Sequence, residues 1–191
     1  ALTATQLKGL SDAFIANLDT TQLAALTNAQ VGSLTTTAMR GLGSAQMAAL
    51  STTQLSGLSP TQIASLTTAQ LSGLTVDQVG SLNTTQLNAL TATQLGGLTA
   101  GVVEGLTTTQ LAALNSTQLR SLSGAALSGL SPEQFAALGT SNLSALTTTQ
   151  IGALNSADVS QLTVAQLAAL SPTQMAALST GAIAGLNAEQ L

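Results

Sequence analysis

The sequence is short of the residues that carry most enzyme chemistry. It has no cysteine, histidine, tryptophan or tyrosine, and only 5% of its 191 residues are charged. Without histidine and cysteine there is no imidazole base, thiol nucleophile, Ser-His-Asp triad or zinc site of the usual ligands. The nearest acidic pair, Asp12 and Asp19, fits helix starts better than a catalytic dyad. We therefore expect no enzyme, and no catalytic, cofactor-binding or metal-binding residue.

Few basic residues and no long apolar run exclude two further classes. Three Lys and Arg residues are spread over the whole length, and the formal net charge is −4. Nucleic-acid binding needs clustered Lys and Arg to neutralise phosphates, so we expect no nucleic-acid partner. No apolar stretch approaches the length of a bilayer span, so we expect no membrane insertion. The sequence offers no small-molecule substrate site either.

What the sequence has is one unit of eight residues, repeated about 24 times. Leu106-Thr107-Thr108-Thr109-Gln110-Leu111-Ala112-Ala113 is a regular copy, numbered here as positions 1 to 8. Position 1 is Leu in every copy, position 2 is Ser, Thr, Asn, Asp or Gly, and position 5 is Gln in 17 of 24 copies. Position 6 is always apolar, and position 8 is Gly, Ala or Ser in 21 of 23 copies. A short fixed period is typical of repeat architectures.

Each octad has the pattern of a very short helix. The residues at position 2 are the favoured helix N-caps, and Gln three residues later completes a capping box. The Leu before the cap and the apolar residue at position 6 form a hydrophobic staple. The three prolines, Pro60, Pro132 and Pro172, fall at position 3, the first helical residue, where proline loses no hydrogen bond. Acids gather near the cap and bases at position 7, as the helix dipole favours, and only Glu104 departs from this.

Two other folds are less compatible with the octad. In one continuous helix, the apolar positions would rotate around the axis, and no face would stay apolar. In a β-solenoid, positions 1 and 6 would point to opposite faces of a strand. We predict an all-α solenoid of very short helices, one per octad, with a β-solenoid as the alternative.

The repeats run through residues 1–191 as one solenoid without separate capping domains. Position 6 partly alternates between Leu and a β-branched residue early in the chain, which suggests a higher period of two octads, or two helices per coil. Three octads per coil remains an alternative. The octad at residues 98–105 has no Gln and has a glycine in mid-helix, so we expect a weak or flexible spot there.

The row of Gln side chains at position 5 has two interpretations. The side chains form ladders along the solenoid axis, or each one only completes its own capping box; the second is the simpler prediction. Regular Thr rows also suggest an ice-binding surface, but position 2 is already used by the caps and positions 3 and 4 are mixed.

The ends of the sequence carry the repeat pattern without polar capping units, which solenoids normally need. We expect Leu2 and Leu7 to be exposed at one end, and Leu186 and Leu191 at the other. These ends are complementary, and a head-to-tail contact that does not close yields an open filament. The sequence therefore predicts self-association, or a segment of a longer repeat array.

The octad resembles the Leu-Thr-Thr-x-Gln-[Ile/Val/Leu]-x-Ala tracts of large, adhesin-like surface proteins of proteobacteria. Residues 146–153, Leu-Thr-Thr-Thr-Gln-Ile-Gly-Ala, carry this motif. The resemblance implies secretion and an extracellular or cell-surface role, and it assigns no functional residue. Together with the repeat pattern it indicates a structural fibre, filament or stalk. The alternative function is a binding module that presents a repetitive surface to a polysaccharide or a partner protein.

Overall fold

The structure, a computed structural model, describes residues 3–191 and contains α-helices but no β-strand in that range. Helices and short bends alternate once per octad. The predicted all-α solenoid of very short helices is therefore confirmed, and the β-solenoid alternative is wrong for the described residues. Contacts group the chain into two compact units, Ala1–Gly97 and Leu98–Leu191.

The first unit contains twelve helices within its described residues. They are α1 (Ala4–Lys8), α2 (Asp12–Ala16), α3 (Thr20–Ala24), α4 (Asn28–Gly32), α5 (Thr36–Met39), α6 (Ser44–Ala49), α7 (Thr52–Ser56), α8 (Pro60–Ser65), α9 (Thr68–Ser72), α10 (Val76–Gly80), α11 (Thr84–Asn88) and α12 (Ala92–Gly96).

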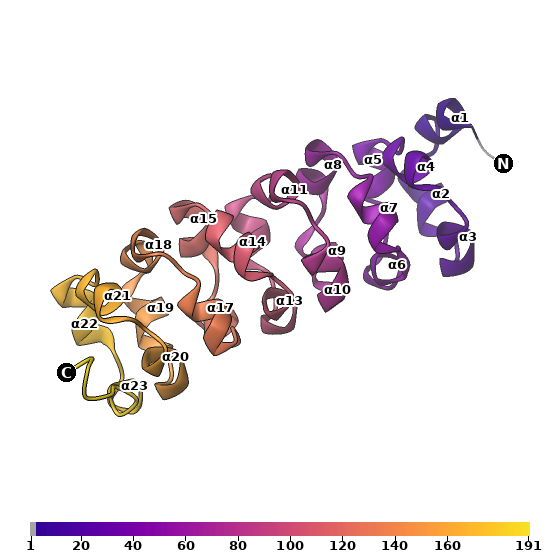
Figure 1. The fold of residues 1–191 in the computed structure, drawn as a ribbon. Coiled ribbons are helices and arrows are strands. Elements are labelled where there is room, and N and C mark those ends of the chain that lie inside the picture. The colour runs from indigo at the N-terminus through magenta and orange to yellow at the C-terminus, as the bar shows by residue number, and fades with distance from the viewer. Residues whose placement is uncertain (1–2) are drawn as a thin grey trace. The chain divides into compact units, whose positions relative to one another are not determined.

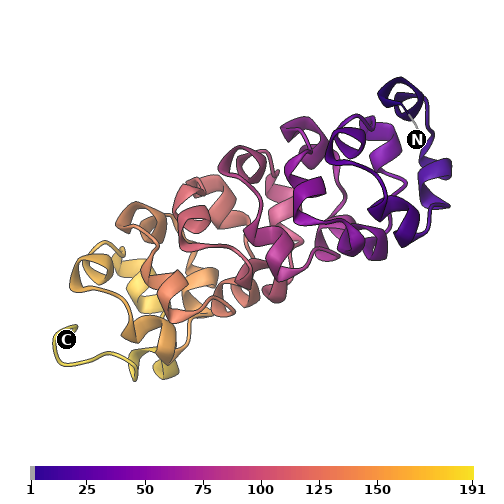
Figure 2. The same ribbon diagram turned by 45° about the vertical axis from the view of Figure 1, so that its right-hand side comes forward.

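The second unit continues the same pattern. Its helices are α13 (Ala100–Glu104), α14 (Thr108–Ala113), α15 (Ser116–Ser121), α16 (Gly124–Ser128), α17 (Pro132–Ala136), α18 (Thr140–Ala145), α19 (Thr148–Gly152), α20 (Ser156–Ser160), α21 (Val164–Ala168), α22 (Pro172–Ala177) and α23 (Thr180–Ile183). Figures 1 and 2 show that the chain leaves each short helix at a bend and enters the next in a new direction.

The helix boundaries follow the octad as predicted. In α14, the N-cap Thr107 has extended backbone angles (φ −71°, ψ 159°). Its side-chain hydroxyl accepts a hydrogen bond from the backbone N–H of Gln110. The Oε1 of Gln110 in turn accepts a hydrogen bond from the Thr107 backbone N–H at 2.7 Å, which completes the capping box. Leu114 is again extended (φ −66°, ψ 133°), so the helix ends there and the next octad begins. The prolines begin α8, α17 and α22, as their position in the octad predicted.

Each helix packs against the helix three octads away. In the first unit α4 contacts α7, and in the second α19 contacts α22, so one coil of the solenoid consists of three octads, each with its helix (Figure 1). The predicted period of two helices per coil is therefore wrong, and the alternative of three is confirmed. The alternation at position 6 does not indicate the number of octads per coil, because both kinds of residue are equally buried: Leu55, Ile63, Leu71 and Val79.

Positions 1 and 6 form the core of each unit. Leu55 is fully buried and Leu58 is 3% exposed, and the same holds for their equivalents in most octads. Position 8 is small where two coils approach closely: a Cβ on Gly73 would lie 2.7 Å from the Cα of Ser44, in the coil before. Glycine is required at Gly73 for this backbone contact and not for a special backbone angle, since no described glycine has a positive φ.

The octad at residues 98–105 folds into the helix α13 despite its unusual sequence. Its N-cap, Thr99, makes no side-chain cap hydrogen bond, and Val102 replaces the usual Gln. Val102 is 4% exposed and Val103 is fully buried, so apolar packing is retained where the capping box is lost. The division between the two units falls directly before this octad, at Gly97 and Leu98.

The expected exposure of apolar residues at the ends is only partly correct. Leu7 is fully buried because α1 contacts α4, so its predicted exposure is wrong. Leu191 is 89% exposed, as expected, whereas Leu186 is half-buried, so its predicted exposure is met only in part. Leu2 lies outside the described residues.

Candidate functional site

The polar feature repeated most often inside the solenoid is the Gln at position 5. Gln54 is 4% exposed, and its Oε1 accepts a hydrogen bond from the Ser51 backbone N–H at 2.8 Å. Its Nε2 donates to the carbonyl oxygens of Leu23 at 2.9 Å and Leu26 at 2.7 Å, which belong to the preceding coil. One side chain thus closes a helix cap and joins two coils.

This contact recurs with one geometry. Each Nε2 donates to the carbonyl 28 residues earlier, at 2.5–2.9 Å, and we call these residues the glutamine ladder: Gln46, Gln54, Gln62, Gln70, Gln78, Gln86 and Gln94 in the first unit, and Gln134, Gln150, Gln166, Gln174 and Gln190 in the second.

The preference for a capping box without a ladder is therefore wrong. A capping box uses only the Oε1 of glutamine, and a buried Nε2 without an acceptor would cost about 1–3 kcal/mol. The acceptors are carbonyls at the bend between two helices of the preceding coil. The carbonyl of Leu26 lies beyond the end of a helix, whereas that of Leu23 also accepts the Leu26 backbone N–H at 3.1 Å. Within the described residues, every buried side-chain nitrogen or oxygen has a hydrogen-bond partner.

The acidic pair at the start of the chain serves helix starts, as predicted. Asp19 is the N-cap of α3, and its Oδ1 accepts a hydrogen bond from the Gln22 backbone N–H at 2.7 Å. Asp12 is the first residue of α2, and its Oδ1 accepts from the Ala13 N–H at 2.8 Å. Both carboxylates are occupied by local backbone contacts, and both residues are exposed.

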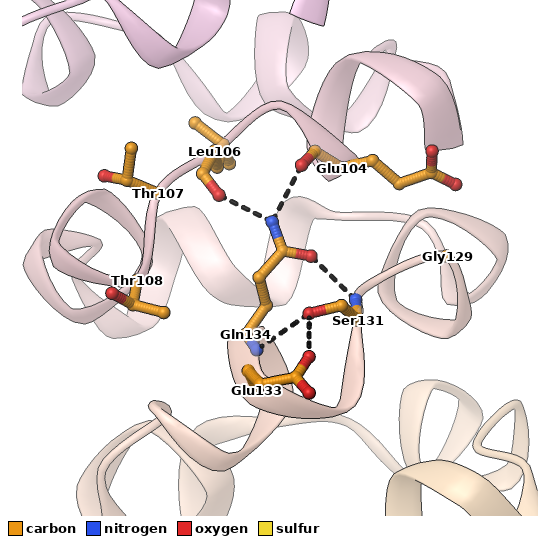
Figure 3. A pocket seen from close by; sticks show the side chains of 8 residues that line it. All are labelled: Glu104, Leu106, Thr107, Thr108, Gly129, Ser131, Glu133 and Gln134. Atoms are coloured by element: carbon orange, nitrogen blue, oxygen red, sulfur yellow. Dashed lines mark hydrogen bonds between the residues drawn. The ribbon is translucent and has the colours of Figure 1, made fainter.

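One surface pocket of about 490 Å³ lies in the second unit, between segments of adjacent coils. It is lined by Glu104, Leu106, Thr107, Thr108, Gly129, Ser131, Glu133 and Gln134. Figure 3 shows Gln134 between the carbonyls of Glu104 and Leu106 on one side and the Ser131 turn on the other. Gln134 donates to these two carbonyls at 2.7 and 2.6 Å, so the floor of the pocket is a member of the glutamine ladder.

The polar groups of this pocket are engaged in a helix start. The Ser131 hydroxyl accepts from the Gln134 backbone N–H at 3.2 Å and donates to Glu133 Oε2 at 2.9 Å. The backbone N–H of Glu133, and after it this hydroxyl, lower the pKa of the exposed Glu133 carboxyl. Glu104, the one charge that departs from the octad pattern, lies at the rim. The pocket therefore offers hydrogen-bond acceptors and hydroxyl groups to a ligand. The Ser131 hydroxyl, however, is already engaged in the N-cap of α17.

The sequence did not predict this pocket. The segments that line it are three octads apart in the sequence, a separation that places them side by side only when a coil contains three octads. In the sequence, the only unusual feature among the residues that line the pocket is the charge of Glu104, which departs from the octad pattern. Nowhere within residues 3–191, this pocket included, do three Asp, Glu, His or Cys side chains lie close enough together to hold a metal ion.

None of the helices in the described part of the chain has the length and apolar character to cross a bilayer.

Comparison with known families matches the octads themselves. The model of the ALTTAQ repeat matches residues 28–67, 48–84, 103–140 and 135–172, which together cover more than half of the chain. Residues 145–150, Ala-Leu-Thr-Thr-Thr-Gln, show the motif as it runs from position 8 of one octad to position 5 of the next. No curated protein matches the chain.

Proposed function

Because the chain belongs to the ALTTAQ repeat family, we propose that it is a structural repeat protein that forms an extracellular fibre, filament or stalk by self-association. The proposal depends mainly on the direction of the glutamine ladder. Every ladder Nε2 donates toward the preceding coil, so each coil offers amide donors on one side and carbonyl acceptors on the other. A coil of a second copy carries the same pattern, and its acceptors match the donors of the first.

Two donors of this kind, on Gln6 and Gln22, have no acceptor among the described residues. Gln6 and Gln22 close their capping boxes by accepting hydrogen bonds at Oε1 from Thr3 and Asp19, both at 2.9 Å. Within the described residues, the Nε2 of each makes no hydrogen bond, and both side chains are exposed. We propose that these amides donate to bend carbonyls of another copy. Self-association through such neutral hydrogen bonds and apolar packing is insensitive to ionic strength, because salt screens charges only.

Analytical ultracentrifugation of the whole chain across concentration, in low and high salt, tests self-association. The expected result is a weight-average mass that rises with concentration to the same extent in both salts. The matched variant is Gln6→Glu with Gln22→Glu, which keeps the Oε1 acceptors of the caps but removes both free donors. It should stay monomeric while its circular dichroism spectrum is unchanged. A wild-type monomer at high micromolar concentration in both salts would overturn the filament.

The extracellular location is a separate part of the proposal. It is supported by the resemblance of the octads to tracts of bacterial surface proteins and by the low fraction of charged residues, which leaves a surface rich in uncharged Thr and Ser. Antibody labelling of intact and permeabilised source cells tests it. Label on intact cells is the expected result, and label only after permeabilisation contradicts an extracellular role.

A further inference from the structure

Asp158 occupies a ladder position without being able to act as a ladder residue. It stands at position 5 of its octad, in α20, which packs against α17 in the coil before. It is 2% exposed, and its Oδ2 accepts a hydrogen bond from the Asn155 backbone N–H at 2.9 Å. The carboxylate therefore replaces the Oε1 of glutamine in the capping box but has no counterpart of the Nε2 donor.

The carbonyls that a ladder residue would serve here are those of Leu130 and Leu127, at the same sequence spacings as in the rest of the ladder. At the equivalent place one octad before, Gln150 donates to Leu122 and Leu119, both at 2.7 Å. No side chain of the described residues donates to the Leu127 or Leu130 carbonyl. By this spacing, the Asp158 carboxyl stands on the side of its coil where these acceptors are expected. Ionised, it offers them no hydrogen, whereas a protonated carboxyl carries one donor.

The described helices that pack against α20 bring no cation to this carboxylate. Of the two helices that pack against α20, α17 carries one titratable group, the exposed Glu133, and α23 carries none. Glu189, in the octad that stacks beside this coil, is also exposed. Burial raises the pKa of Asp158, and the hydrogen bond from the Asn155 N–H opposes this only in part.

The same octad departs from the repeat at a second contact. At the close approach between coils, position 8 faces the first helical residue of an octad in the coil before, as Gly185 faces Ser156 and Gly129 faces Ala100. The corresponding residue of this octad is Gln161, one of two large residues at position 8 in the chain. By the same spacing of 29 residues its counterpart in the coil before is Pro132, and the Gln161 side chain is exposed. The α17–α20 contact therefore lacks both the ladder bond and the small residue.

We infer that Asp158 makes the stacking of α20 on α17 sensitive to pH, so that a neutral carboxyl favours the closed contact and the carboxylate opens it. The folded-state pKa of Asp158 lies above its unfolded-state value, so its stabilisation is complete below the unfolded-state pKa. It is lost as the pH rises through the folded-state pKa. Between the two values, the opening equilibrium rises by up to about tenfold per pH unit.

Hydrogen–deuterium exchange of the whole chain from pH 3 to pH 8, corrected for intrinsic rates, tests this inference. Peptides that cover residues 124–136 and 154–168 should lose protection as the pH rises through the folded-state pKa of Asp158. The variant Asp158→Asn keeps the size and the acceptor of the side chain but cannot ionise, so its protection should be independent of pH over this range. Asp158→Gln restores the octad pattern and should behave in the same way.

The exposed Asp77 provides the control, because Asp77→Asn also removes one carboxylate but leaves the ladder untouched. It should retain the wild-type pH dependence at residues 124–168. Equal pH profiles for wild type and Asp158→Asn would overturn the inference. A loss of protection that spreads evenly over all peptides would overturn it as well, because the effect would then not arise at this coil contact.

Discussion

Gln86 donates hydrogen bonds from its Nε2 to the carbonyl oxygen of Leu55, 31 residues earlier, and to that of Leu58, both at 2.9 Å. The other end of the same amide accepts a hydrogen bond from the Asn83 backbone N–H at 3.1 Å. Gln86 is 1% exposed, so both ends of the amide are used away from water. A single side chain therefore fixes where a helix begins and which coil it stacks on.

The first prediction concerns Gln86→Glu, which keeps the acceptor of the helix cap but removes the donor to the preceding coil. The new carboxylate still accepts the Asn83 bond, but it has no donor and is buried against the two carbonyls. We expect unfolding free energy at neutral pH to fall by about 2–4 kcal/mol, the cost of a buried polar group left unpaired and charged. Protonation restores a donor, so much of this loss should be regained in acid. Urea unfolding at neutral and acidic pH measures it.

Gln22→Glu is the matched control for this prediction. Gln22 closes a capping box in the same way, through the Asp19 N–H at 2.9 Å, but it is exposed and its Nε2 serves no carbonyl of the described residues. We expect a change within about 0.5 kcal/mol, as for surface substitutions. If both variants lose the same stability, the cap accounts for the effect, and the ladder contributes nothing measurable.

The difference between local and coil-level structure explains what the sequence predicted. Helix starts depend on residues three apart, such as Ser51 and Gln54, so the phase of every helix followed from the octad. The number of octads per coil depends on contacts 28 to 31 residues apart, such as Gln54 to Leu26 and Leu23. Because all octads have nearly the same sequence, the sequence does not indicate which other helix a given helix packs against.

The pocket beside Glu104 was missed for the same reason. Its two sides come from adjacent coils, and their pairing depends on the number of octads per coil. The ladder was also underestimated, because a capping box explains Oε1 and leaves Nε2 out of account. Counting both ends of each buried amide would have required an acceptor in another coil.

The second prediction concerns the small residues at position 8. Gly73→Ala places a Cβ against the backbone of Ser44, where its distance to the Ser44 Cα is 2.7 Å, so α9 must move away from α6. We expect a loss of about 1–3 kcal/mol, typical of overpacking. Gly101→Ala is the matched variant, because a Cβ at Gly101 has no neighbour within 4 Å and the residue lies inside α13.

Gly101→Ala should raise stability by about 0.5–1 kcal/mol, since alanine loses less backbone entropy than glycine in a helix. Thermal melting of the two variants beside the wild type measures the opposite signs. A stability that is unchanged or raised by Gly73→Ala would mean that the coils are not in close contact at Gly73.

The third prediction uses proline to test the phase of the short helices, at Thr108 and Leu111 of α14. Thr108 is the first residue of the helix, and the cap before it, Thr107, has φ −71° and ψ 159°. These angles match those of Ser59 (φ −70°, ψ 157°), which precedes Pro60 at the start of α8. Proline restricts the preceding residue to this extended region, so Thr108→Pro fits without strain. We expect stability to be unchanged or raised by up to about 1 kcal/mol, through the smaller entropy of the unfolded chain.

Leu111→Pro removes a hydrogen bond that the helix uses. The Leu111 N–H donates to the Thr107 carbonyl at 2.9 Å, and the proline ring would clash with that oxygen. The substitution also empties a fully buried position of the core. We expect a loss of at least about 3 kcal/mol from the backbone effect, with the lost burial added to it. Thermal melts of the two variants decide the phase: similar damage at both positions would show that Thr108 is not the first helical residue, and a tolerated proline at Leu111 would contradict the helix itself.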